Sequence, residues 1–379
     1  MIHTLKLFDT PLLQFEVVEN LADPVVRIVE INEGSRSLLP LDMEQNAEGL
    51  ARWLKRRVIP QNRAFVNAFL ARCGLSANRP MDVITVCKGL SLNDSYWICG
   101  ENETKTFDQV NLYENRFSSV LASIAFTGYG SSVRSSFASS PEFTTNGMLP
   151  KCWRRIDGRI WLYKGATSGA SNTGYEPYSE KYAFLAGRQL GFDVIPYRLT
   201  RWKGNLCSAC ELFTDKETAY IPVGRIVRTG GMRAVRTYYE SLGGEFVRSL
   251  NEMLVFDALI CNTDRHFGNF GVLVDSRTNR IIRPAPLFDH GSALFNYAGS
   301  EFWASEEKLN AYAATLQPCV YEDFFQAARD AMDTDLAGKV RKALDFHMED
   351  EGRLRYPKAW IRLMEKQIRR RASIILTGK

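Results

Sequence analysis

Three polar residues in the C-terminal half of the chain have the types and the spacing that phosphoryl transfer requires. Asp264 and Asn269 are five residues apart, and Asp289 follows twenty residues after Asn269. In a kinase, one aspartate orients and deprotonates the acceptor hydroxyl, an asparagine holds a magnesium ion, and a later aspartate holds magnesium against the ATP phosphates. We therefore predict that Asp264 is catalytic and that Asn269 and Asp289 are ligands of Mg²⁺.

The elements around these residues are predicted to bring them together. Apolar residues recur at helical spacing over residues 245–261, which predicts a helix that is buried on much of its surface. Residues 270–283 have the pattern of strand, turn and strand, so the return strand would bring Asp289 back beside Asn269. An aspartate and an asparagine at this spacing occur often by chance. The buried helix, the hairpin and the second aspartate together favour the functional interpretation.

A lone carboxylate falls inside the predicted helix. Asp257 lies on the apolar face of that helix, where a charged group needs a partner. We expect Arg265 or a loop amide to be this partner, and we expect Asp257, Arg265 and His266 to support the catalytic loop. His266 and His290 should make structural hydrogen bonds within their loops, because the aspartates already fill the roles of base and metal ligand.

An upstream lysine stands in the order that an ATP site requires. Residues 159–164 read as a strand that ends in Lys164, and a helix over residues 178–190 follows after a small polar loop. A kinase needs a lysine on the phosphates and a carboxylate that holds this lysine. We predict that Lys164 contacts ATP and that Glu180 pairs with it, with Glu176 as the alternative partner.

A serine- and threonine-rich segment precedes the lysine strand. Its position suits a loop over the phosphates, with backbone N–H groups as donors, and Asn146 and Gly147 are its candidate ATP contacts. An ordinary surface loop is the alternative, because the segment has a single glycine. The hydroxyl groups that could be autophosphorylated are those of Ser139, Ser140, Thr144 and Thr145.

A possible hinge follows a predicted strand over residues 206–210. Glu211 and Phe213 stand between the strand-rich and the helical parts of the chain, where backbone groups could pair with adenine. A plain strand end is the alternative interpretation.

The composition is that of an ordinary globular protein. The chain has 379 residues, of which 45% are hydrophobic and 24% are charged. The net charge of +5 does not require a nucleic-acid partner, and we expect no direct nucleic-acid binding. No apolar run approaches the roughly 20 residues of a membrane helix, and the start does not resemble a signal peptide. The eight scattered cysteines indicate a reduced compartment, so we expect a cytoplasmic protein, while secretion or delivery as an effector stays open.

The distribution of strand and helix patterns predicts an α+β protein in three parts. These are a mixed N-terminal subdomain, a β-rich lobe with the phosphate loop and the ATP lysine, and a mostly helical lobe with the catalytic loop and the metal site. Their expected bounds are residues 1–110, 111–214 and 215–379.

The segments 257–270 and 285–289 resemble the signature and the metal-binding segment of HipA-type serine/threonine kinases. This resemblance implies a two-lobed, protein-kinase-like fold with ATP and Mg²⁺ as cofactors. Carried over by position, it gives Asp264 the catalytic role, Asn269 and Asp289 the metal, and Lys164 the ATP phosphates. The best-known members are toxins of bacterial toxin–antitoxin pairs, so the resemblance also implies a small DNA-binding antitoxin as a partner.

The resemblance is strong over residues 255–295, moderate over 144–214 and weak over 1–110. Thr144-Thr145-Asn146-Gly147 stands where family members often carry a serine that is autophosphorylated.

We expect an ATP- and Mg²⁺-dependent protein serine/threonine kinase that could phosphorylate itself and could belong to a toxin–antitoxin pair. A lipid or small-molecule kinase on the same fold is an alternative, because the basic stretch 366–371 could meet anionic headgroups. A protein that sequesters a partner through an inactive site is another. No motif encodes the protein substrate, since the acceptor is chosen by surface shape.

Overall fold

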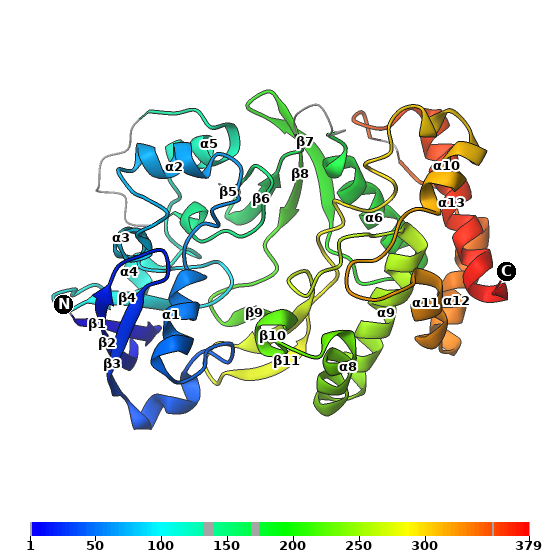
Figure 1. Cartoon of the computed structure of the whole chain (residues 1–379). Coiled ribbons are helices and arrows are strands. Elements are labelled where there is room, and N and C mark those ends of the chain that lie inside the picture. Colours follow the sequence, from blue (N-terminus) through cyan, green and yellow to red (C-terminus); the bar gives the residue numbers. More distant parts are fainter. Residues whose placement is uncertain (1, 132–139, 168–173, 351, 379) are drawn as a thin grey trace. The chain divides into compact units, whose positions relative to one another are not determined.

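The computed structural model describes residues 2–131, 140–167, 174–350 and 352–378 (Figure 1). The chain divides into two compact units, each built from three segments. The first unit contains residues 1–164, 211–221 and 273–282, and the second contains residues 165–210, 222–272 and 283–379. Antiparallel sheets lie in the N-terminal half and helices dominate the C-terminal half, so the predicted α+β class is confirmed. The three-part division at residues 110 and 214 stays a prediction.

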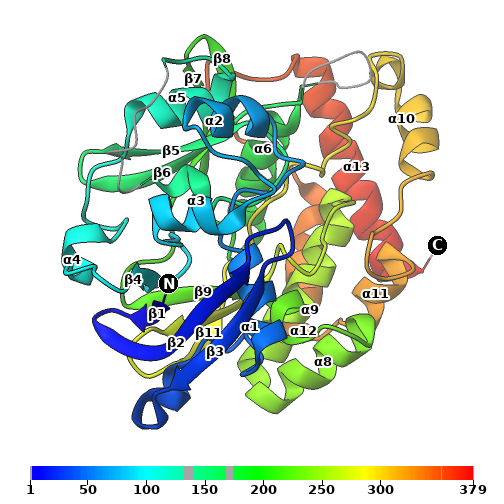
Figure 2. The same ribbon diagram turned by 60° about the vertical axis from the view of Figure 1, so that its left-hand side comes forward.

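The first unit begins with a four-stranded antiparallel sheet in the order β3-β2-β1-β4, of which Figure 2 shows β1 to β3 side by side. Its strands are β1 (Ile2–Leu7), β2 (Thr10–Glu19), β3 (Val25–Ile31) and β4 (Tyr96–Gly100). Helix α1 packs against β3, and the fully buried Leu5, Phe15 and Trp53 belong to the core that forms there. The helices of this unit are α1 (Ala47–Lys55), α2 (Val66–Arg72), α3 (Pro80–Cys87), α4 (Phe107–Val110) and α5 (Ser119–Thr127).

Further strands of the first unit carry or adjoin the predicted nucleotide contacts. Strands β5 (Lys151–Ile156) and β6 (Arg159–Lys164) form an antiparallel hairpin that places Lys151 opposite Lys164. A three-stranded sheet in the order β11-β10-β9 falls mostly in this unit. It consists of β9 (Thr218–Pro222), β10 (Gly271–Asp275) and β11 (Arg280–Pro284), so the predicted hairpin over residues 270–283 is confirmed.

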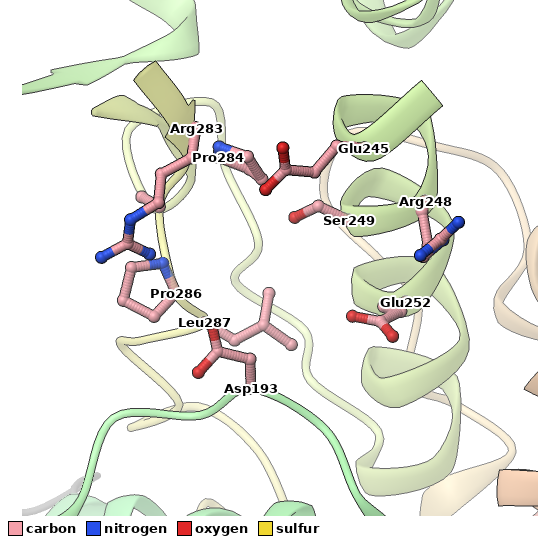
Figure 3. A pocket seen from close by; sticks show the side chains of 10 residues that line it. Asp193, Glu245, Arg248, Ser249, Glu252, Arg283, Pro284, Pro286 and Leu287 are labelled. Carbon is pink, nitrogen blue, oxygen red and sulfur yellow. The ribbon is translucent and has the colours of Figure 1, made fainter. Parts of the chain in front are cut away.

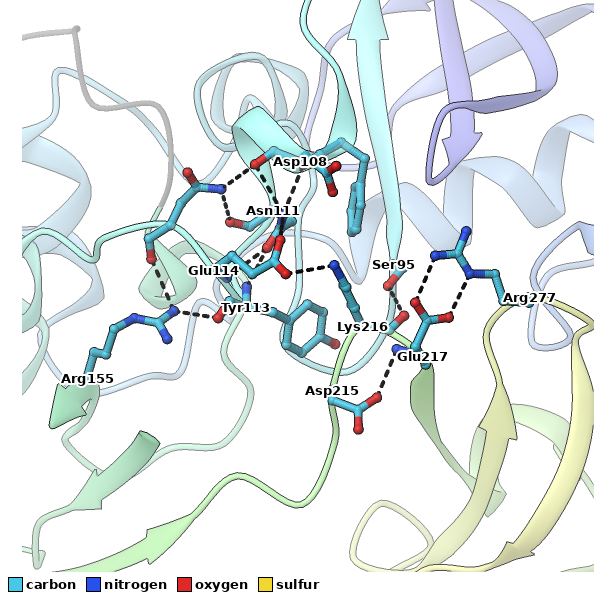
Figure 4. Close-up of polar contacts among 12 residues, drawn as sticks. Ser95, Asp108, Asn111, Tyr113, Glu114, Arg155, Asp215, Lys216, Glu217 and Arg277 are labelled. Carbon is cyan, nitrogen blue, oxygen red and sulfur yellow. Dashed lines mark hydrogen bonds and ion pairs between the residues drawn. The ribbon is translucent and has the colours of Figure 1, made fainter. Parts of the chain in front are cut away.

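Polar contacts fasten the segment 211–221 within the first unit (Figure 4). The hydroxyl of Ser95 donates to the carbonyl of Lys216 at 2.6 Å, and the Lys216 ammonium lies 2.7 Å from Glu114. The carboxylate of Glu217 accepts two hydrogen bonds from Arg277 in the β10–β11 turn, at 2.6 and 2.8 Å. The segment that contains the predicted hinge is therefore held on both sides.

The second unit is mostly helical. Helix α9 (Gly244–Ile260) packs against three other helices: α8 (Gly231–Leu242), α11 (Phe324–Asp330) and α13 (Lys358–Thr377). The side chains of α9 are buried without interruption from Met253 to Ile260, which confirms the predicted buried helix. The remaining elements are α6 (Glu176–Leu190), β7 (Tyr197–Trp202), β8 (Asn205–Glu211), α7 (Val223–Ile226), α10 (Glu306–Ala313) and α12 (Thr334–Lys342).

The basic stretch 366–371 is only partly exposed on α13, because Lys366 and Arg370 are exposed while Arg369 is half-buried and Arg371 is buried. Lys366 pairs with Glu306 at 2.6 Å, and Arg369 donates to the carbonyl of Phe346 at 3.1 Å. Arg371 is only 3% exposed and donates to the carbonyl of Ala258 in α9. Most of this stretch therefore fastens α13 to its neighbours. No helix within the described residues is long and apolar enough to cross a membrane.

Two helical glycines of the second unit differ in the space around them. A Cβ at Gly187 in α6 would lie 2.4 Å from Val194 and 3.2 Å from the Phe256 ring, whereas a Cβ at Gly338 in α12 would meet nothing within 4 Å. We expect Gly187→Ala to lower the free energy of unfolding by about 1–3 kcal/mol, because the overpacked interface outweighs the better helix propensity of alanine. Gly338→Ala should instead raise it by up to about 1 kcal/mol. Urea denaturation of both variants measures these changes, and equal effects would contradict the close packing of Gly187 against Val194 and Phe256.

Candidate active site

The predicted catalytic loop begins where α9 ends. Cys261 adopts a left-handed conformation with φ of 53°, and its backbone N–H bonds to the carbonyl of Asp257. The next residue, Asn262, is fully buried, and its side-chain oxygen accepts the backbone N–H of Asp264 at 3.3 Å. The side chain of Asp264 is exposed. A buried support thus presents the predicted catalytic carboxylate to solvent.

A buried ion pair lies beneath this loop. Arg265 Nε is 2.8 Å from Asp257 Oδ2, Arg265 Nη2 is 3.0 Å from Asp257 Oδ1, and both side chains are 0% exposed. Such a two-bond arrangement fixes the plane of the guanidinium as well as its position. Burial alone would lower the pKa of Arg265, but the Asp257 carboxylate raises it above its usual value, so the arginine stays charged. Of the two partners expected for Asp257, Arg265 or a loop amide, the structure shows Arg265 as its ion-pair partner.

The same guanidinium joins the predicted catalytic loop to the predicted metal-binding segment. Arg265 Nη1 donates to the carbonyl of Asn269 at 2.9 Å and to the carbonyl of Phe288 at 2.7 Å. The side-chain amide of Asn269 donates to the carbonyl of Asp264 at 3.1 Å, which directs its nitrogen inward and leaves its oxygen as the candidate ligand. The carbonyl groups of Asn269 and of Phe288, the residue before Asp289, thus accept hydrogen bonds from the same nitrogen, Arg265 Nη1.

Side chains from α6 and β7 hold the backbone around Asp289. Asp289 has a φ of 58°, and its N–H donates to the Tyr197 hydroxyl at 3.2 Å. The N–H of His290 donates to Glu180 Oε2 at 2.8 Å, and the Ser179 hydroxyl donates to the His290 carbonyl at 2.6 Å. The ring of His290 packs edge-on against Phe256 of α9, with centroids 5.5 Å apart. Tyr197 and Ser179 were not predicted, because neither belongs to a local motif.

The two predicted metal ligands fit a magnesium ion that takes its remaining ligands from water and phosphate. Asn269 offers an amide oxygen and Asp289 a carboxylate, and both are the hard donors that Mg²⁺ prefers. Within the described ranges, no group of three or more His, Cys, Asp or Glu side chains is arranged to hold a metal. Such a site suits an ion whose coordination is completed by water and phosphate, and it does not suit a metal caged by the protein alone.

The predicted partners of Lys164 belong to the second unit. Glu180 is fully buried, and the bond from the His290 N–H uses its Oε2. Glu176 accepts the N–H of Thr167 at 3.3 Å with Oε1, while its buried Oε2 has no hydrogen-bond partner among the described residues. Lys164 is the last residue of β6 in the first unit and is 7% exposed. Its pairing with Glu180 or Glu176 stays a prediction.

The predicted phosphate loop has a buried base and an exposed tip. Glu142 is 0% exposed, accepts the N–H of Trp153 at 3.0 Å and bonds to Ser140, and its burial raises the pKa of its carboxyl. At the tip, Asn146 and Gly147 are exposed. Gly147 has a φ of 91°, and a Cβ there would collide with the ammonium of Lys151. Lys151, which was not predicted, therefore adds a positive charge to this tip.

The candidate phosphorylation sites differ in accessibility. Ser140 and Thr144 are buried, and Thr144 donates to the carbonyl of Leu90 at 2.7 Å, which disfavours phosphate transfer to either hydroxyl in this conformation. Thr145 is half-buried and donates to the carbonyl of Pro141 at 2.6 Å. Ser139 lies outside the described residues.

The predicted hinge runs beside β6. The N–H of Leu212 donates to the carbonyl of Ile160 at 2.8 Å. The Glu211 side chain pairs with Arg159 at 3.1 Å, and the Phe213 ring packs edge-on against Tyr220. Adenine recognition by these two residues stays a prediction.

His266 has the structural role that the sequence suggested, because its Nδ1 accepts the N–H of Gly268 at 3.0 Å. A pocket of about 140 Å³ in the second unit lies between α9 and residues 283–287 (Figure 3). Glu245, Ser249 and Glu252 line its helical wall. None of the predicted site residues lines this pocket.

Comparisons with known proteins identify the fold. Neither a protein-family model nor a curated protein matches the sequence. Among solved structures, HipA of the toxin–antitoxin system of Shewanella oneidensis, in complex with HipB and operator DNA, matches with a TM-score of 0.55 and 11% identity, over 98% of this chain and 96% of that one. The proinflammatory kinase CtkA of Helicobacter pylori has a TM-score of 0.47 and 18% identity, over 60% of this chain and 89% of that one. The chain therefore has the HipA-type, kinase-like α+β fold, and the resemblance inferred from the sequence is confirmed at the level of the fold.

The buried ion pair predicts a large effect of removing one partner. Asp257→Ala should lower the free energy of unfolding by about 3–5 kcal/mol, because it leaves the Arg265 charge buried without its counter-ion. The double variant Asp257→Ala/Arg265→Met should recover part of this loss. Glu306→Ala, which breaks the exposed pair with Lys366, serves as the matched control and should cost no more than about 1 kcal/mol. Chemical denaturation measures all three, and a loss at Asp257 no larger than the control would refute the role of the pair.

Proposed function

We propose that this chain is an ATP- and Mg²⁺-dependent protein serine/threonine kinase. The observation that carries the proposal is the Arg265 guanidinium, which bonds to the carbonyls of Asn269 and Phe288 and so joins the two predicted metal-binding segments. Asp264 is attached to the same arrangement through the Asn269 amide. The HipA-type fold supports this function.

In the proposed reaction, Asp264 accepts a hydrogen bond from the hydroxyl group of the acceptor and takes its proton as the phosphoryl group is transferred. The exposure of this carboxylate suits an acceptor on another protein. Asn269 and Asp289 would hold Mg²⁺, which neutralises the charge that develops on the phosphate oxygens. The fixed loop holds Asp264 in place before the acceptor arrives, and such preorganisation lowers the cost of reaching the transition state.

The first unit would supply the nucleotide contacts. Lys164 and the exposed loop tip at Asn146 and Gly147 are the proposed phosphate contacts, with Lys151 as an additional cation beside that tip. The backbone of Glu211 and Phe213 would meet the adenine. Glu180 would serve as the carboxylate partner of Lys164 while its Oε2 accepts the His290 N–H.

The partner and the acceptor form the finer part of the proposal. HipA was solved with HipB and operator DNA, which supports a small DNA-binding antitoxin as a partner of this chain and a role in a toxin–antitoxin pair. We place the protein in the cytoplasm. Thr145 is the candidate autophosphorylation site that is not fully buried among those described.

Two alternatives have less support. A lipid kinase that uses the stretch 366–371 would need several cations available at the surface. Lys366 is exposed but paired with Glu306, and Arg371 is buried, so Arg370 is the exposed cation that is left. A protein that only sequesters a partner would not need an exposed aspartate mounted on a buried ion pair.

Removal of either aspartate tests the function. We expect Asp264→Ala and Asp289→Ala to lower phosphate transfer by about 10³-fold or more, because each removes a group that acts on the transition state. Asp330→Ala, which removes an exposed carboxylate on α11, should leave transfer unchanged. The measurement is incubation with ATP and Mg²⁺, followed by mass spectrometry of the protein and of a cell lysate. Full transfer by Asp264→Ala would overturn the assignment, and the phosphosites lost in the variants would identify the acceptor.

A further inference from the structure

The backbone around Asp289 is held by side chains and not by a sheet. Arg265 donates to the carbonyl of residue 288 at 2.7 Å, the Tyr197 hydroxyl accepts the N–H of Asp289 at 3.2 Å, and Glu180 accepts the N–H of residue 290 at 2.8 Å. Ser179 closes the set by donating to the carbonyl of residue 290 at 2.6 Å. Three consecutive residues are thus fixed through their main-chain atoms.

The conformation of Asp289 explains why such anchoring is needed. Its φ of 58° lies in the left-handed region, which costs free energy for any residue with a Cβ. A strained conformation persists only where the surroundings determine it. The N–H of Asp289 lies in the peptide plane from which this φ is measured, and the Tyr197 hydroxyl is its acceptor.

The strand pairing and the burial of Tyr197 hold its side chain in place. It is the first residue of β7, where it pairs with Cys210 in β8, and its side chain is 7% exposed. The hydroxyl is thus held in the place where it accepts the N–H of Asp289.

We propose that Tyr197 is a positioning residue for the metal-binding carboxylate of Asp289, which it directs by holding the backbone N–H of that residue. This inference rests on the proposed function, in which Asp289 binds Mg²⁺. Without the hydroxyl, the N–H of the half-buried Asp289 loses the Tyr197 acceptor, and the backbone can turn toward a less strained φ. The carboxylate then leaves the direction in which it meets the metal.

Tyr197→Phe tests the proposal, because it removes the hydroxyl and keeps the buried ring. Tyr182→Phe in α6 is the matched control: its hydroxyl also accepts a backbone N–H, from Tyr356 at 3.0 Å, and in addition donates to Asp350 at 2.9 Å. Binding of Mn²⁺ in the presence of a non-hydrolysable ATP analogue is measured by electron paramagnetic resonance, alongside thermal unfolding. We expect Tyr197→Phe to weaken Mn²⁺ binding about tenfold, the loss typical of one buried hydrogen bond. The control should bind Mn²⁺ like the unaltered chain although its unfolding temperature falls at least as much.

Phosphate transfer gives a second readout. In Tyr197→Phe, the lowered rate should recover at high Mg²⁺ concentration, whereas the rate of Asp289→Ala should not. Equal Mn²⁺ affinities of Tyr197→Phe and the control would overturn the positioning role. Asp289→Asn separates the two levels: if it binds Mn²⁺ normally, the metal assignment itself fails, and if it loses Mn²⁺ while Tyr197→Phe does not, only the role of Tyr197 fails.

Discussion

The contact on which the site depends is the ion pair between Asp257 and Arg265, which is wholly removed from water. A charge in such a place is tolerated only when its bonds are satisfied. Here the surplus donors of the guanidinium bond to two backbone carbonyls from segments on either side of the β10–β11 hairpin. The hydrogen bonds that one buried guanidinium requires therefore bring Asn269 and the segment before Asp289 together. The geometry of the candidate site thus depends on the stability of a buried charge.

Helix α9 makes this arrangement rigid. Its buried residues pack on neighbouring helices, and Phe256 contacts the rings of both Phe192 and His290. The left-handed Cys261 ends the helix and turns the chain into the catalytic loop. The side chain of Asp264, which follows this support, is exposed to solvent. Rigid support and an accessible functional group are thus supplied by adjacent stretches of one chain.

Features that depend on local patterns could be predicted from the sequence. Helix α9, the hairpin after Asn269 and the pairing of Asp257 with Arg265 follow from periodicity, turn residues and the cost of a lone buried charge. Tyr197 and Ser179 could not be predicted, because their partners lie 92 and 111 residues away. The burial of Thr144 could not be predicted either, since its acceptor, the carbonyl of Leu90, is 54 residues away. The sequence around Tyr197, Ser179 and Thr144 does not distinguish them from the other tyrosine, serine and threonine residues of the chain.

Because side chains from distant segments hold the backbone of residues 288–290, a fragment that contains only the motif would not reproduce the candidate site. A fragment covering residues 245–300 would contain every residue of the motif, yet it would lack Ser179, Glu180 and Tyr197, which provide three of the four anchors. Competence to bind the metal is therefore expected to appear only when α6 and β7 have docked, late in the assembly of the unit, because contacts between distant parts of a chain form slowly. The motif contains the predicted ligands, and residues far away in the sequence hold the backbone that carries one of them.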